Sequence, residues 1–237
     1  MTELVYRDAY LQTTDARVIG ETDDGALLVN RTVFYPTSGG QPGDTGAITW
    51  PGGTAEVVNT VKAEDQVALV LAEGAERPQE GDQISQQIDW GRRFGHMRVH
   101  TALHLLSVVI PLPVTGGSIS TEKGRLDFNM PEAPEDKEEI ARALNALIAS
   151  DMPVTDDWIT DAELEERPEL VKTMSVKPPV GQGRVRLVRI GEGDAQVDLQ
   201  PCGGTHVART SEIGRVRIGK IEKKGRQNRR VYLHLDE

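Results

Sequence analysis

The sequence predicts an α+β protein in which a small β-barrel (residues 1–90) precedes a domain of mixed helices and strands (residues 91–237). First, glycine and short β-prone runs, divided by turn-forming pairs, fill the N-terminal part. Second, the pattern changes at Trp90, after which apolar residues recur with a helical period. Third, alternating apolar and polar residues return near the C-terminus. The chain therefore reads as strands, then helices, then strands again.

The N-terminal part is expected to form a barrel or an antiparallel sheet. Turn-forming pairs such as Asp24-Gly25 and Pro51-Gly52 separate several of its runs. The glycine-rich stretch at residues 34–46 lacks the ending of a P-loop and the glycine spacing of a dinucleotide fingerprint, so its composition favours tight turns. The β-prone runs are TELVYRDAYL, GALLVN, RTVFYP, GAITW, TAEVVNTVK, QVALVLA and DQISQQIDW.

The C-terminal part is expected to contain two helices and several strands. The first helix, GRRFGHMRVHTALHLLSVVI, should end near Ile110, where two prolines follow. The second, from Glu135 to Ser150, carries apolar residues on one face and acids in its first turn. LEERPELVKT is a short helical or irregular connector. Strands are expected at RVRLVRI (184–190), GRVRIGKI (214–221) and RRVYLHL (229–235).

Charge and composition exclude several classes of protein. The 27 basic and 37 acidic residues give a formal net charge of -10, so nucleic acid is not attracted over the whole surface. The basic segment from Lys220 to Arg230 is typical of a solvated hairpin turn, with a local phosphate-binding patch as the alternative. A single cysteine excludes an intramolecular disulfide, and no apolar run approaches the length of a bilayer span. We expect a cytoplasmic protein with no membrane partner.

Two pairs of side chains have the spacing of metal ligands. His100 and His104 stand four positions apart on the predicted helix, so their imidazoles project from one face. Cys202 and His206 are also four apart and bracket two glycines, which allow the backbone to fold tightly around an ion. Three imidazoles and one thiolate make a ligand set that suits one zinc ion per chain.

Each pair has an ordinary structural explanation as well. A helix histidine is often a core or surface residue, and a lone cysteine is usually a small buried hydrophobe. The conjunction of both pairs favours metal binding. His96 is assigned a supporting or RNA-facing role in place of ligation. Thr101 stands where a zincin protease needs glutamate, which excludes that class of enzyme.

Four segments together resemble a known family. RVHTALHLL and PCGGTHVARTSEIG are similar to the paired motifs of the editing domain that alanyl-tRNA synthetases share with free-standing AlaX-type editing proteins. FYPTSGGQPGDTG resembles the glycine-rich motif of that family's barrel, and GSISTEKGRLDFNM resembles the segment after the histidine helix. The resemblance implies a medium-length member that acts in trans. Its implied reaction is hydrolysis of the ester that joins serine, and sometimes glycine, to tRNA(Ala).

The resemblance also implies catalytic and specificity residues. Thr101, Thr115 and Ser118 are the polar side chains that the family pattern places to bind the serine hydroxyl, and Thr115 stands where members often carry glutamine. The attacking water is activated either at zinc or by the substrate ribose and backbone groups between Gly203 and Thr205. These alternatives stay open at this stage.

The expected partner is the acceptor end of mischarged tRNA(Ala), bound by a monomer. One alternative is a deacylase for Ser-tRNA(Thr), because threonyl-tRNA synthetases share a similar paired motif. Another is a non-catalytic, zinc-stapled RNA-binding module. The glycine-rich motif contributes Gly39, Gly40 and Gln41 to the candidate site. The candidate phosphate contacts are Arg92, Arg93, Arg98, Lys220, Lys223, Lys224 and Arg226.

Overall fold

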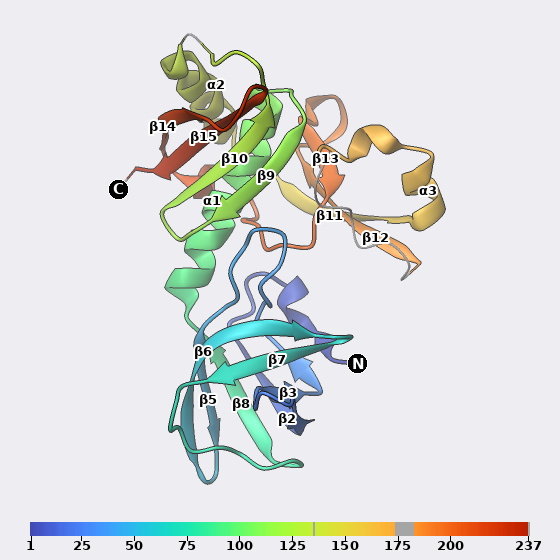
Figure 1. Ribbon diagram of the computed structural model, residues 1–237. Coiled ribbons are helices and arrows are strands. Elements are labelled where there is room, and N and C mark those ends of the chain that lie inside the picture. The colour runs from blue at the N-terminus through green and yellow to red at the C-terminus, as the bar shows by residue number, and fades with distance from the viewer. Residues whose placement is uncertain (135, 174–182, 237) are drawn as a thin grey trace. The chain divides into compact units, whose positions relative to one another are not determined.

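The computed structural model describes residues 1–134, 136–173 and 183–236. Strands dominate it, and helices are few (Figure 1). The chain divides into two compact units, Met1–Phe94 and Gly95–Glu237, which are described separately. Within the described ranges, no helix is both long and apolar enough to cross a bilayer.

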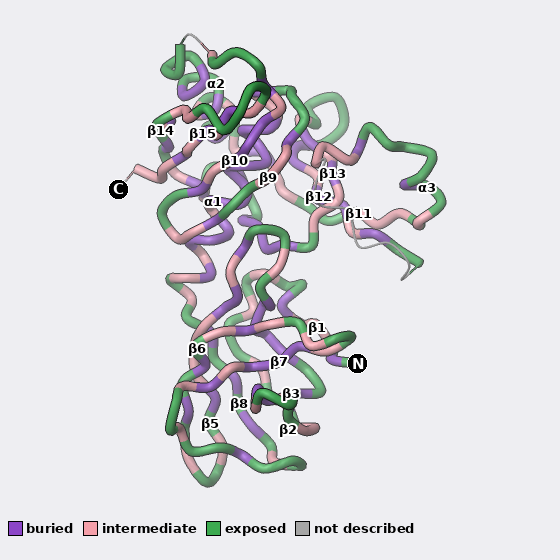
Figure 2. The backbone as a smooth tube through the Cα atoms, viewed as in Figure 1, coloured by how far each residue is buried: buried purple, intermediate pink, exposed green. Residues whose placement is uncertain are grey.

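The first unit contains a closed six-stranded antiparallel barrel with the strand order β2-β3-β7-β6-β5-β8. Alternate residues of its strands point inward, so buried and exposed positions alternate along the tube in Figure 2. Closure leaves none of these six strands with an open edge. The strands are β2 (Thr13–Glu21), β3 (Leu27–Val29), β5 (Gly46–Trp50), β6 (Gly53–Ala63), β7 (Gln66–Leu71) and β8 (Gln83–Ile88). Their core includes Ala16, Val18, Leu27, Ile48, Val57, Leu69 and Ile84.

Two of the β-prone runs are shorter as strands than the sequence predicts. The first run yields only β1 (Glu3–Leu4) before a 3-10 turn at Val5–Arg7, and RTVFYP yields only β4 (Arg31–Thr32). β1 and β4 pair in parallel outside the barrel, and the chain then turns so that Tyr6 and Tyr35 pack edge to face. Aromatic burial, rather than strand pairing, therefore explains the hydrophobic residues of these runs.

The glycine-rich stretch forms the tight turn that its composition favours. Ser38 and Gln41 exchange backbone hydrogen bonds of 3.0 and 2.9 Å across Gly39 and Gly40. Both glycines have positive φ, 57° and 84°, the backbone that a two-residue hairpin turn of this hand requires. A side chain at either position would strain the turn, which is why glycine occupies both.

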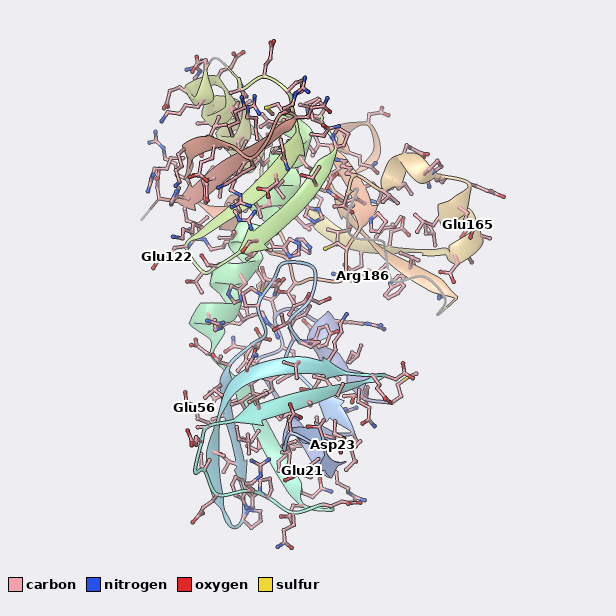
Figure 3. All side chains as sticks on the ribbon, viewed as in Figure 1. Glu21, Asp23, Glu56, Glu122, Glu165 and Arg186 are labelled. Carbon is pink, nitrogen blue, oxygen red and sulfur yellow. The ribbon has the colours of Figure 1, made fainter. Side chains whose placement is uncertain are left out.

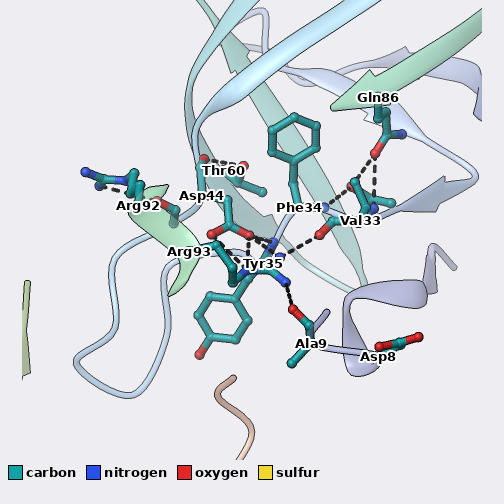
Figure 4. A network of polar contacts seen from close by, with 12 residues as sticks. Asp8, Ala9, Val33, Phe34, Tyr35, Asp44, Thr60, Gln86, Arg92 and Arg93 are labelled. Carbon is teal, nitrogen blue, oxygen red and sulfur yellow. Dashed lines mark hydrogen bonds and ion pairs between the residues drawn. The ribbon is translucent and has the colours of Figure 1, made fainter. Parts of the chain in front are cut away.

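A buried ion pair fixes the end of this stretch (Figure 4). The Arg93 and Asp44 side chains are 0% and 1% exposed and pair within the first unit. Arg93 also donates to the carbonyls of Ala9, at 3.0 Å, and Val33, at 2.7 Å. Asp44 additionally accepts from the Tyr35 backbone N–H at 2.7 Å. Both charges are thus satisfied inside the protein, which is the condition for burying them.

The second unit contains a four-stranded antiparallel sheet with the order β14-β15-β10-β9. The central pair joins distant parts of the chain, since Lys123 of β10 lies opposite His234 of β15. Helix α1 (Trp90–Val109), which agrees with the predicted helix, packs on β10: a Cβ at Gly124 would lie 2.6 Å from Val99 and 2.9 Å from Leu103. Only glycine allows this close approach. The strands are β9 (Val114–Ile119), β10 (Lys123–Asn129), β14 (Val216–Lys223) and β15 (Asn228–Leu235).

The second predicted helix is α2 (Lys137–Ala149). It begins after Asp136, whose side chain caps the first turn by accepting from the backbone N–H groups of Glu138 and Glu139. The predicted start at Glu135 lies outside the described residues. Its apolar face is buried as the periodicity indicates, through Ile140, Ala141, Leu144 and Ile148.

A smaller sheet with the order β11-β12-β13 completes the second unit. β12 (Arg184–Ile190) matches the predicted strand residue for residue and is flanked by β11 (Val154–Thr160) and β13 (Asp198–Pro201). The predicted connector LEERPELVKT begins within the last turn of α3 (Asp161–Glu165) and contains a 3-10 turn at Pro168–Leu170. Further 3-10 turns occur at Gly193–Ala195 and Thr210–Ile213. This sheet has its own core of Leu164, Leu170, Val185 and Leu187.

Replacing Arg93 with Met should lower the free energy of unfolding by about 3–5 kcal/mol, because Asp44 would stay buried without a cation. The control Arg31→Met removes an ion pair with Glu3 in which the side chains are 44% and 59% exposed. That change should leave the free energy of unfolding nearly unchanged, because water screens an exposed pair. Urea unfolding of both variants measures the difference, and equal losses would contradict a structural role for the buried pair.

Candidate metal centre

The second unit brings the two predicted ligand pairs together. His100 and His104 face the loop after β13, which carries Cys202 and His206, and the four candidate ligand atoms lie within 4.8 Å of one another. The Cys202 Sγ is 3.5 Å from His100 Nε2 and 3.3 Å from His206 Nε2. Three buried imidazoles and one thiol that converge in this way have the chemistry and spacing for a single metal ion.

Local structure explains why these residues meet. The i, i+4 spacing places the two α1 histidines one turn apart, with their ring centroids separated by 5.3 Å. After β13 ends at Pro201, the loop curls back on its own cysteine, and the Gly204 backbone N–H donates to Cys202 Sγ at 3.4 Å. Neither loop glycine has a positive φ, so the turn does not require the left-handed backbone that favours glycine. A Cβ at Gly203 would meet no atom of the described residues within 4 Å.

Arg186 of β12 holds this loop (Figure 3). Its Nη1 donates to the carbonyls of Cys202, at 3.1 Å, and Gly204, at 2.7 Å. Its Nη2 donates to Asp156 Oδ1 of β11 at 2.7 Å. One guanidinium therefore ties the backbone on either side of Gly203 to the neighbouring sheet, which fixes where the thiol points.

Thr101 supports His206 and is not presented to a substrate. Its hydroxyl is fully buried, donates to the Met97 carbonyl at 2.9 Å, and lies 3.1 Å from His206 Nδ1 and 3.3 Å from the Val207 N–H. The hydroxyl proton is used on the Met97 carbonyl, and the two acceptor sites of the oxygen are used by the Val207 N–H and His206 Nδ1. The expectation that Thr101 binds the serine hydroxyl therefore does not fit, and the residue instead orients the imidazole.

His104 has a carboxylate partner on its other ring nitrogen. His104 Nδ1 lies 3.0 Å from Asp198 Oδ2, and Asp198 also accepts from Lys172 at 2.5 Å and from Gln200 at 2.8 Å. Burial acts to lower the pKa of His104, but its hydrogen bonds with Asp198 and Cys202 outweigh burial and raise it to about 9. The carboxylate and the thiol thus stabilise a positive charge on the His104 ring.

The charges within the cluster also perturb the other ligands. Burial opposes ionisation of Cys202, but His100 and His206 overcome it and hold the thiol pKa well below its ordinary value. Burial, together with the charge of His100, lowers the pKa of His206 to about 3. A thiolate beside a neutral imidazole is the protonation state in which both bind a metal.

The other predicted specificity residues lie on β9 and in the loop. Thr115 is half-buried, and its hydroxyl donates to the Asp127 carbonyl at 3.1 Å. Ser118 is exposed on the same strand, whereas Thr205 is buried within the ligand loop, directly before His206. Gly39, Gly40 and Gln41 belong to the first unit, where they form the turn described above.

The predicted phosphate contacts fall into three groups. Arg93 is buried in its ion pair, so a phosphate contact does not fit it. Arg92 and Arg98 are half-buried, and Arg98 donates to the Ile213 carbonyl at 2.8 Å. On the β14–β15 hairpin, Lys220 and Lys224 both pair with one acid and hold the pKa of that acid, Glu222, at about 2. Lys223 and Arg226 extend into solvent beside them.

Sequence reasoning missed Arg186, Asp198 and Lys172. Asp198 occupies a buried position of a short strand, four residues before Cys202. A buried acid indicates that a hydrogen-bonding or charged partner is present. Arg186 alternates with apolar residues on β12 and so resembled an outward-facing charge. Its contacts with carbonyls of the distant loop have no sequence signature.

Comparisons with known proteins agree with the family that the sequence resembles. The family described as threonyl and alanyl tRNA synthetase second additional domain matches residues 185–232, and tRNA synthetases class II (A) matches residues 8–92. Alanine--tRNA ligase of Pyrobaculum calidifontis is 34% identical over 93% of this chain and 25% of its own length. Alanyl-tRNA editing proteins AlaX-M of Methanosarcina acetivorans and Methanosarcina barkeri are 36% and 37% identical, each over 99% of both chains. With such identity over nearly the full length of its relatives, the chain belongs to the AlaX-M family of alanyl-tRNA editing proteins.

Proposed function

We propose that this chain is a zinc-dependent trans-editing hydrolase that removes serine, and also glycine, from mischarged tRNA(Ala). Family membership makes it an aminoacyl-tRNA hydrolase. The observation that carries the rest is the convergence of His100, His104, Cys202 and His206 within one buried cluster. In this proposal, residues 91–237 form the editing domain, and the barrel of residues 1–90 with its Gly39-Gly40-Gln41 turn assists it.

The donor set supports zinc as the ion. Imidazole nitrogen and thiolate sulfur are the ligands of zinc sites, and the lowered pKa of Cys202 makes the thiolate available at neutral pH. When bound, zinc supplies a Lewis acid that holds the substrate's amino group or hydroxyl, polarises the ester or acidifies water. Asp198 holds the imidazole of His104 by a hydrogen bond, and Thr101 holds that of His206 in the same way.

The protein's own groups then position the ester. Among the described residues, the space beside Gly203 is open and leaves room for a substrate next to the cluster, and Arg186 holds the carbonyls on either side of it. We assign the orientation of the attacking water to backbone groups between Gly203 and Thr205. An aminoacyl ester is already activated, so orientation and delivery of water account for most of the required catalysis.

Discrimination between serine and alanine is assigned to Thr115 and Ser118 of β9. The Thr115 hydroxyl lies 3.1 Å from the Asp127 carbonyl and 3.3 Å from Asn228 Oδ1, and we assign its oxygen as the acceptor for the serine hydroxyl. Alanine offers no such donor and leaves the site's polar group unsatisfied. Ser118 is exposed on the same strand and is a second candidate partner.

Two other functions fit individual observations. The matched family covers threonyl as well as alanyl synthetases, which is compatible with Ser-tRNA(Thr), although the editing proteins of both Methanosarcina species are named for alanine. A shell of four protein ligands is typical of structural zinc, so a non-catalytic staple is the other candidate. The first experiment below separates all three.

Wild-type protein should hydrolyse Ser-tRNA(Ala), spare Ala-tRNA(Ala) and Ser-tRNA(Thr), and carry about one zinc ion per chain, as expected for a single four-ligand site. Cys202→Ala should lose both zinc and activity, because the thiolate ligand is gone. His234→Ala is the control, since this histidine lies on β15 outside the cluster. Deacylation and bound zinc are measured together. A folded, zinc-loaded protein inactive on Ser-tRNA(Ala) would overturn the proposal.

Thr115→Val should reduce the preference for Ser-tRNA(Ala) over Ala-tRNA(Ala) by at least about tenfold, because an isosteric side chain loses the hydroxyl. The measurement is the ratio of kcat/KM for the two substrates. Thr155→Val, an exposed threonine on β11, serves as the control and should leave the ratio unchanged. An unchanged ratio in Thr115→Val would remove this residue from the specificity site.

Lys223→Ala and Arg226→Ala should each weaken tRNA binding and reduce the slope of log K against log salt by about 0.7–0.9, the effect of one lost phosphate contact. Lys224→Ala should change the slope less, because Lys224 already pairs with Glu222. Binding of tRNA over a series of salt concentrations provides the slopes. Identical slopes for all proteins would show that the hairpin does not contact phosphate.

A further inference from the structure

Asp198 is a buried carboxylate next to the candidate metal centre and is not itself one of the four ligands. Its side chain is 0% exposed, so each oxygen needs partners within the protein. Oδ2 faces His104 Nδ1 at 3.0 Å and Gln200 Nε2 at 2.8 Å, and Oδ1 faces Lys172 Nζ at 2.5 Å. Elements far apart in the sequence therefore meet on one carboxylate.

The contact with His104 determines how that imidazole is used. An ionised carboxylate only accepts hydrogen bonds, so Nδ1 must carry the proton that it donates to Asp198. The other nitrogen, Nε2, faces the cluster and offers its lone pair when a metal ion takes the place of the second ring proton. We propose that Asp198 is a positioning residue that fixes the tautomer and orientation of His104 for metal binding. This inference rests on the zinc site of the proposed function.

The network also fixes Asp198 itself. Gln200 lies 3.4 Å from Ser107 Oγ, whose hydroxyl donates to the His104 backbone carbonyl at 2.7 Å. The carboxylate is thus connected to both the ring and the backbone of the same helical residue. A rotation of the ring would have to break the bond to Asp198, while Gln200 and Lys172 hold Asp198 in place.

Lys172 connects this support to the strand that carries Thr115. Its ammonium group balances the charge of Asp198, and its backbone carbonyl accepts from the Val114 N–H at 3.0 Å. Val114 also forms a parallel bridge with Thr173 and directly precedes Thr115. The position of the metal ligand and the start of β9 are therefore set by the same lysine.

The experiment compares zinc binding by the full-length wild type, Asp198→Asn, Asp198→Ala, Lys172→Met and the double variant Asp198→Asn with Lys172→Met. Asp157→Asn is the matched control, because Asp157 is a carboxylate on the same small sheet that pairs with Arg189 away from the cluster. Zinc affinity is measured by competition with a chelator, and the coordination geometry by the visible absorption of the cobalt-substituted protein. Circular dichroism of each variant establishes that it is folded.

Asp198→Asn should bind zinc about 10–100-fold more weakly and change the cobalt spectrum, and Asp198→Ala should lose at least as much. Lys172→Met should have a smaller effect, and in the Asp198→Asn background it should have almost none, because its partner is already neutral. The double substitution keeps the test decisive even if Asp198→Ala fails to fold. Asp157→Asn should bind zinc as the wild type does.

Wild-type zinc affinity and an unchanged cobalt spectrum in Asp198→Asn would overturn the positioning role, as would a wild type that binds no zinc. Additive effects of Lys172→Met and Asp198→Asn would overturn the assignment of Lys172. These readouts do not depend on deacylation. If zinc binding falls in Asp198→Asn while no protein hydrolyses Ser-tRNA(Ala), the positioning role stands and the proposed function fails.

Discussion

The second unit is organised around one constraint: four nitrogen and sulfur donors are buried within 4.8 Å of one another. Lone pairs gathered in a low-dielectric interior repel one another unless a cation or a proton lies between them. The perturbed pKa values of Cys202, His104 and His206 all express this constraint. The surrounding groups orient the ligands. Thr101 and Asp198 contact the Nδ1 atoms of His206 and His104, respectively, and Arg186 holds the loop that carries the Cys202 thiol.

The first unit also buries charged side chains, but there each charge is balanced by another side chain. Asp44 and Arg93 carry opposite charges that balance each other. Backbone groups form hydrogen bonds with both side chains, so this buried pair needs no ion. None of the four ligands carries a permanent positive charge like that of Arg93. A strongly basic side chain does lie close by, but Lys172 is turned toward Asp198 and serves the supporting carboxylate instead of the donors. This difference distinguishes a structural charge pair from a site built to accept an ion.

Much of this architecture could be predicted from the sequence, and the failures have physical causes. The spacing of His100 with His104 and the period of α2 are local features of a helix, so the sequence alone reveals them. β2 was missed because only Ala16 and Val18 are buried along it, which leaves no continuous apolar run. Thr101 was misassigned because the sequence does not distinguish a threonine whose hydroxyl is buried from one whose hydroxyl binds a substrate. Arg186, Asp198 and Lys172 act through contacts between distant segments, which a pattern of neighbouring residues does not contain.

The pairing of β10 with β15 has a consequence for how the protein is made. Lys123 lies opposite His234, so the centre of the four-stranded sheet forms only when nearly the whole chain has been synthesised. The helix with His100 and His104 leaves the ribosome much earlier than the loop with Cys202 and His206, because synthesis proceeds from the N-terminus at about 5–20 residues per second. For several seconds the nascent chain carries half of a metal-binding set. The complete four-residue set exists only after Cys202 and His206 have been synthesised, and a truncated product that ends before them retains only the two histidines.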